Sequence, residues 1–104
     1  MTNEQMIKII QKAVDKYGEK QLDIAQEEFA ELIQALSKYK RAITPEEFRH
    51  AKIMVIEELV DAYIMLNQIC LLLDLINNDF TANDSLNNMM EYKLRRLDKR
   101  MENE

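Results

Sequence analysis

Two pairs of acidic side chains in this sequence share the same spacing. Glu28 and Glu31 form the first pair, and Glu58 and Asp61 form the second. Three residues advance a helix by about 300°, so the members of each pair lie on one helix face, one turn apart. Like charges this close repel unless a cation lies between them. If the two segments are antiparallel neighbouring helices, the four carboxylates can converge on such a cation.

Mg²⁺ fits four oxygen ligands without His or Cys, because this hard ion prefers carboxylates and keeps water or substrate phosphates as its other ligands. Mn²⁺ is the expected substitute. For either pair alone, the ordinary alternative is a solvated helix surface. Asp61 argues against that alternative, because the apolar segment LVDAYIML around it predicts burial. An unpaired buried charge is costly, so this position favours a function.

The motifs E-x-x-E and E-x-x-D occur in order, within EEFAELIQALSKYKR (residues 27–41) and EELVDAYIMLNQI (residues 57–69). These segments resemble the two metal-binding helices of MazG-like nucleotide pyrophosphohydrolases, and with the final helix the similarity covers most of the chain. The resemblance implies an all-α enzyme that hydrolyses a nucleoside triphosphate to a monophosphate and pyrophosphate. It also implies that Glu28, Glu31, Glu58 and Asp61 hold Mg²⁺. Glu28 is the candidate base for the attacking water, a role open to any carboxylate of the cluster.

Other polar residues are candidates for contact with the substrate. Lys93, Arg96 and Arg100 lie on one stripe of the final helix and could bind phosphates, and similar basic residues occur late in the family. Lys38, one heptad after the first acidic pair, is a further candidate. For such residues the alternative is a solvated surface charge. Gln68, one heptad after the second pair, either touches substrate or completes a buried polar patch.

Several neighbouring residues have competing interpretations. Glu27 and Glu57 precede the two pairs and are expected to face solvent or to support the ligands. Glu47 and His50 have the E-x-x-H spacing of di-iron bundles, and although the sequence has only one His, a di-iron site is the rival interpretation for the identity of the metal. A capping role already accounts for Glu47.

Four helices are expected to position these residues. One Gly and one Pro leave little material for hairpin turns, whereas residues with high helix propensity dominate, so the class is all-α. Capping and periodicity predict helices over about 3–16, from 19 or 20 to 41, from 45 to about 73 or 76, and from the turn-rich segment 77–83 to about 101. We expect one domain over 1–104, folded as a compact four-helix bundle.

Composition excludes several classes of protein. A net charge of −5 disfavours binding to a nucleic-acid polymer, which needs clustered cations. The apolar stretch 59–76 contains four polar residues, so a buried helix is expected rather than a membrane span. The single Cys70 allows no intrachain disulfide, and no export signal is visible, which favours the cytoplasm.

The third predicted helix is apolar on most of its circumference after Glu58, more than three partner helices can cover. We therefore expect a homodimer or homotetramer.

The competing function is a non-catalytic helical interaction or regulatory module with a surface or vestigial acidic cluster. The sequence does not disclose the preferred base and sugar, and aromatic residues such as Phe29 and Tyr63 either stack on a base or pack.

Overall fold

The computed structural model describes residues 1–77 and 79–104. These residues form four α-helices: α1 (Asn3–Tyr17), α2 (Lys20–Arg41), α3 (Pro45–Leu72) and α4 (Asp84–Glu102). The described part of the chain has no strand, only an isolated antiparallel bridge between Ile76 and Ala82. The all-α class is confirmed, and the helix ends differ from the predicted ends by only a few residues.

The limits of α1 follow from local chemistry. The Thr2 hydroxyl accepts a hydrogen bond from the Gln5 backbone N–H at 3.1 Å, and the Gln5 side chain accepts one from the Thr2 N–H at 2.8 Å. This reciprocal capping box satisfies two amide donors that an uncapped helix leaves free. Gly18 ends the helix with φ 57° and ψ −140°, a positive φ that glycine tolerates without steric cost.

The start of α3 is capped in a slightly different way. The Thr44 hydroxyl accepts from the Glu47 backbone N–H, and Pro45 occupies the first helical position. The Glu47 carboxylate accepts from the Ile43 N–H at 3.0 Å, one residue before the cap. This cap directs α3 back along α2 after only three connecting residues, 42–44.

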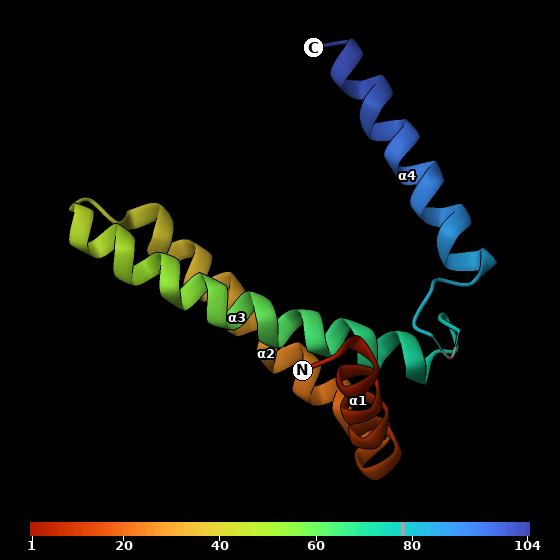
Figure 1. Cartoon of the computed structure of the whole chain (residues 1–104). Helices are drawn as coiled ribbons and strands as arrows, with labels where there is room; N and C mark the ends of the chain where they lie inside the picture. The colour runs from red at the N-terminus through yellow and green to blue at the C-terminus, as the bar shows by residue number, and fades with distance from the viewer. Residues whose placement is uncertain (78) are drawn as a thin grey trace.

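The antiparallel pair α2–α3 is the centre of the fold (Figure 1). Its buried core consists mainly of alanines, which let the two backbones approach closely. The buried apolar residues are Ala25, Ala35, Ala51, Ala62 and Met65. No large side chain is fully buried in the described part of the chain. The pair is therefore a thin two-helix layer with much of its apolar surface uncovered.

The other two helices relate to this pair differently. α1 packs mainly on α3, whereas α4 contacts none of α1, α2 and α3 within residues 1–77 and 79–104 and projects away from them (Figure 1). The radius of gyration is 16.8 Å, against about 13 Å for a compact domain of this length. The expected compact four-helix bundle is thus not formed within one chain, because α4 lies apart.

Among the described residues, none of the four helices combines the length and the apolar character that a membrane crossing requires.

Candidate metal centre

Three carboxylates converge between α2 and α3. One oxygen each from Glu28 and Glu31 on α2 and from Glu58 on α3 lies within 4.8 Å of the others. The helical spacing places the first two on one face, and the antiparallel pairing brings the third opposite them. The convergence predicted for these three residues is therefore present in the fold.

Burial differs among the three carboxylates. Glu28 and Glu58 are half-buried in the seam between the helices, and Glu31 is exposed at its edge. Within residues 1–77 and 79–104, the Oε2 atoms of Glu28 and Glu58 are buried and have no hydrogen-bond partner. Buried carboxylate oxygens normally have partners, so this pair leaves strong acceptor capacity for a donor or cation from outside the chain.

The electrostatics of the cluster reflect mutual repulsion. Burial raises the pKa of Glu28 above its usual value, and the nearby charges of Glu31, Asp61 and Glu58 raise it further. Burial also raises the pKa of Glu58, followed by the charge and a side-chain hydrogen bond of Glu31. Each carboxylate thus favours protonation of its neighbours when no cation is present.

The sequence predicted that Asp61 is buried, but its side chain is exposed. Its neighbours Val60 and Tyr63 are 51% and 65% exposed, so the apolar segment around Asp61 is surface in the single chain. Asp61 lies beside the three-carboxylate group rather than within it. It still acts on Glu28, whose pKa is raised by the nearby charge of Asp61.

The predicted phosphate-binding cations are not brought to the cluster within one chain. Lys93, Arg96 and Arg100 are exposed on α4, which contacts no other helix in the described ranges. The Arg96 guanidinium lies 5.9 Å from the ring centroid of Tyr92, one turn earlier. Lys38 is exposed in the last turn of α2. A phosphate contact from α4 would require a second copy or a movement of the helix.

Gln68 is 3% exposed and lies between α2 and α3. Its Oε1 accepts a hydrogen bond from Gln21 Nε2 at 2.7 Å, and its Nε2 donates to Met65 Sδ at 3.4 Å. These bonds form a buried polar link between the two helices. Gln21 was not singled out in the sequence, because nothing local to it signals a partner 47 positions away.

The remaining candidates lie outside the cluster. Glu27 and Glu57 are exposed, and His50 is exposed near the start of α3. The Glu47 carboxylate bonds the Ile43 N–H instead of approaching His50. Within the residues that the structure describes, His50 and Glu47 join no group that could hold a metal.

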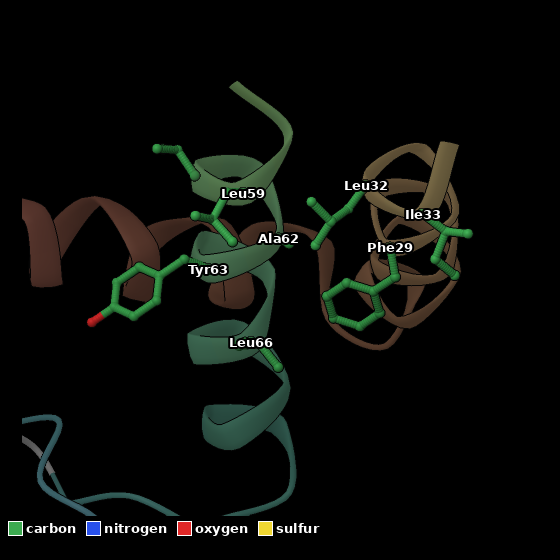
Figure 2. Close-up of a pocket in the computed structure, with 8 residues that line it drawn as sticks. Phe29, Leu32, Ile33, Leu59, Ala62, Tyr63 and Leu66 are labelled. Atoms are coloured by element: carbon green, nitrogen blue, oxygen red, sulfur yellow. The ribbon is translucent and has the colours of Figure 1, made fainter. Parts of the chain in front are cut away.

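The opposite flank of the same helix pair is apolar. Phe29 lies about 100° to one side of Glu28 around α2, whereas Glu31 lies about 60° to the other side. Phe29 belongs to a shallow groove of about 690 Å³ that α2 and α3 line together. In Figure 2, Leu32 extends toward α3, and the Tyr63 ring turns away from α2. The helix pair thus presents carboxylates on one side and an open apolar surface on the other.

The arrangement brings one oxygen each from Glu28, Glu31 and Glu58 close enough to share a single small cation between the two helices. Comparison with known proteins found no matching family model, no similar curated protein and no similar solved structure.

Proposed function

We propose that this chain is a Mg²⁺-dependent nucleoside triphosphate pyrophosphohydrolase of the MazG-like type, which converts a (d)NTP and water into a (d)NMP and pyrophosphate. Its acidic centre comprises Glu28, Glu31 and Glu58, with Asp61 at the edge. Mn²⁺ substitutes for Mg²⁺. The free thiol of Cys70 suits the cytoplasm, where we propose that the enzyme acts.

One observation carries the proposal: two buried carboxylate oxygens from different helices, Glu28 Oε2 and Glu58 Oε2, have no partner among the residues that the structure describes. A third carboxylate, that of Glu31, contributes an oxygen within 4.8 Å. Three negative charges without a compensating protein cation are costly in this seam, and a hard divalent ion removes that cost. The donor set, oxygen only, suits Mg²⁺ better than it suits zinc or iron.

Each residue has a distinct role in the proposed reaction. Glu28, Glu31 and Glu58 would hold the metal, which when bound would neutralise the triphosphate and polarise the scissile phosphate. Glu28 is also proposed to orient the water and to accept its proton, a role open to any carboxylate of the cluster. The water oxygen bonds to the α-phosphorus, and the bond from that phosphorus to the bridging oxygen breaks, releasing pyrophosphate.

The substrate phosphates need further cations. We propose that Lys93, Arg96 and Arg100 supply them from α4, with Lys38 and Gln68 as further candidates on the helix pair. Because α4 stands apart from α1–α3 in the described chain, this role is compatible with a homodimer or homotetramer in which helices of different copies meet.

The second candidate function is a non-catalytic interaction module. The exposed side chain of Asp61 and the uncovered apolar groove favour it, because both suit a surface that binds another protein. In that case the carboxylates are a surface or vestigial cluster, and purified protein binds its partner without hydrolysing nucleotides.

Incubation of the purified protein with canonical and modified dNTPs and NTPs tests the proposal. With Mg²⁺ or Mn²⁺ we expect equal amounts of monophosphate and pyrophosphate, and none with a chelator. Release of inorganic phosphate and a diphosphate contradicts the proposed bond cleavage. Absence of turnover over the whole panel, with a folded protein and bound Mg²⁺, favours the interaction module.

A further inference from the structure

The single chain exposes more surface than a folded domain of its size. Its accessible surface is 8564 Å² for a mass of 12.3 kDa, whereas a compact monomer of that mass exposes about 6,100 Å². The excess, roughly 2,500 Å², exceeds the ~800 Å² that each partner buries in a standard protein interface. Within the described residues, the chain therefore has ample surface for a stable partner.

Much of this surface lies on α4. Its apolar stripe is open to solvent: Met90, Leu94 and Met101 are 53%, 57% and 55% exposed. In proteins, most of the stability of an amphipathic helix such as α4 comes from packing its apolar stripe. The stripe thus requires an apolar surface outside α4.

The groove on α2 and α3 is the complementary surface. Phe29, Leu32, Ile33, Leu59 and Leu66 contribute to its lining, and no charged side chain does so. The groove lies between α2 and α3, and Figure 2 shows the side chains that each helix contributes to it. A third helix can lie along such a groove with its apolar residues inserted between those of the pair.

Charge favours the same match. The segment from Lys93 to Arg100 carries five cations and one carboxylate, a net charge of +4. By contrast, α3 carries five carboxylates and two Lys or Arg residues, a net charge of −3. Opposite net charges attract the two helices at long range, whereas Glu58 and Asp61 lie on the flank opposite the groove and do not contact the docked stripe.

The turn after α3 determines which groove α4 can reach. The Asn83 side chain accepts from the Leu86 N–H, capping α4, while its Nδ2 donates to the Asp74 carbonyl at 2.8 Å. The Asn83 N–H also donates to the Leu75 carbonyl. These bonds tie the N-cap of α4 to Asp74 and Leu75, just after α3, and α4 projects away from the α2–α3 pair (Figure 1). The groove of another molecule does not require them to break.

We propose that α4 of one chain docks its apolar stripe into the α2–α3 groove of a second copy of this chain, and that the second copy docks its own α4 in return. Reciprocal exchange buries both surfaces and closes as a two-fold dimer. This inference rests on the homo-oligomer part of the proposed function and deepens it. The groove lies on the flank opposite the acidic centre, so the phosphate contacts proposed for Lys93, Arg96 and Arg100 would need a further contact between copies.

Two charge substitutions test the two surfaces separately. Leu94→Glu places a carboxylate in the α4 stripe, and Ile33→Glu places one in the groove. Both residues are more than half exposed in the single chain, so the helices themselves should keep their circular dichroism. Asn88→Glu and Gln34→Glu are the matched controls, since they add the same charge on the exposed faces of the same helices.

Light scattering and sedimentation at micromolar concentration should show a wild-type dimer. We expect each test variant to weaken dimerisation by more than about tenfold, as for a central interface residue, and each control to leave it unchanged. Mixing the two test variants should restore a dimer, because one intact α4 then meets one intact groove. A monomeric wild type, a Leu94→Glu variant that dimerises normally, or a mixture that stays monomeric overturns the exchange. Pyrophosphate release is measured in a separate assay. A failed dimer test therefore does not refute the proposed hydrolysis, and a protein without turnover does not refute the dimer.

Discussion

Glu28 on α2 and Glu58 on α3 bring carboxylate oxygens within 4.8 Å of each other, and each keeps a buried Oε2 without a partner. Two like charges at this distance oppose the pairing of their helices unless a proton or a cation separates them. The fold thus accepts an electrostatic cost at the centre of its main helix pair. Such a cost is typical of a site that is completed by a ligand.

The repulsion between Glu28 and Glu58 should be visible in the pH dependence of the free energy of unfolding. Folding raises the pKa values of Glu28 and Glu58 above 4.5. At pH values between 4.5 and these raised pKa values, the folded protein therefore binds more protons than the unfolded chain. The free energy of unfolding therefore falls as pH rises through this window. We expect the chelator-treated protein to be more stable at about pH 5 than at about pH 7, measured by urea unfolding.

The metal should reverse the sign of this dependence. Mg²⁺ binds the ionised carboxylates, so its stabilisation grows as pH rises and disappears as the carboxylates are protonated. In the double variant Glu28→Gln with Glu58→Gln, the metal-free protein should no longer be more stable at low pH. Its free energy of unfolding should also no longer rise when Mg²⁺ is added. A wild-type protein that is less stable at about pH 5 without metal contradicts the assignment of these two groups.

Neutral variants of the second acidic pair should separate function from fold. Glu58→Gln and Asp61→Asn should fold, with metal-free stability unchanged or slightly raised, because repulsion is removed. Mg²⁺ at a hundredfold excess over its dissociation constant should stabilise the wild type by about 2.7 kcal/mol and the variants by less. Turnover should fall by at least roughly 10- to 100-fold, more in Glu58→Gln, because Glu58 belongs to the three-carboxylate group.

The matched control for this pair is Glu57→Gln, which removes one exposed carboxylate beside the cluster. It should keep the Mg²⁺ response and turnover of the wild type. Thermal unfolding with and without Mg²⁺, together with a pyrophosphate assay, makes the comparison. If Glu58→Gln and Asp61→Asn both behave like the control, the metal centre is wrong and the interaction module stands.

Removal of two α4 cations should affect the substrate but not the metal. The double variant Lys93→Ala with Arg96→Ala should raise the KM for the triphosphate by about tenfold or more, since charge-assisted contacts to phosphate are lost. Its Mg²⁺ affinity, measured by calorimetry, should stay nearly unchanged. The control Arg95→Ala with Lys99→Ala removes the same charge from the other side of α4, where Arg95 only pairs with exposed Glu91. Equal KM values for the two double variants would show that Lys93 and Arg96 are surface charges.

The buried amide contact between α2 and α3 should contribute to stability. Gln21→Ala removes the donor and leaves the Gln68 carbonyl oxygen buried without it, so we expect a loss of about 1–3 kcal/mol in the free energy of unfolding. Adding Gln68→Leu should recover part of this loss, because the stranded polar group is then removed. Chemical unfolding of the two single variants and the double variant measures the coupling. Additive losses would mean that this hydrogen bond does not couple the helices.

The local structure of this protein is encoded in short stretches of sequence. The capping box at Thr2 and Gln5 and the Thr44-Pro45 start of α3 depend on residues only a few positions apart, so the sequence predicted them. The same holds for the i, i+3 spacing that places Glu28 and Glu31 on one helix face. Such features depend on backbone geometry and nearby hydrogen bonds, which local residue types determine.

Longer-range features required the tertiary structure. The apolar residues around Asp61 predicted burial, but apolar character does not specify whether the covering surface belongs to the same chain. In the described chain, α4 leaves its stripe and the α2–α3 groove uncovered, so Val60 and Tyr63, which line that groove beside Asp61, are exposed. The Gln21–Gln68 hydrogen bond and the turn at Asn83 likewise join positions whose distance in space is decided only when the helices pack. Sequence periodicity determined which face of each helix is apolar, whereas packing decided which of those faces meet.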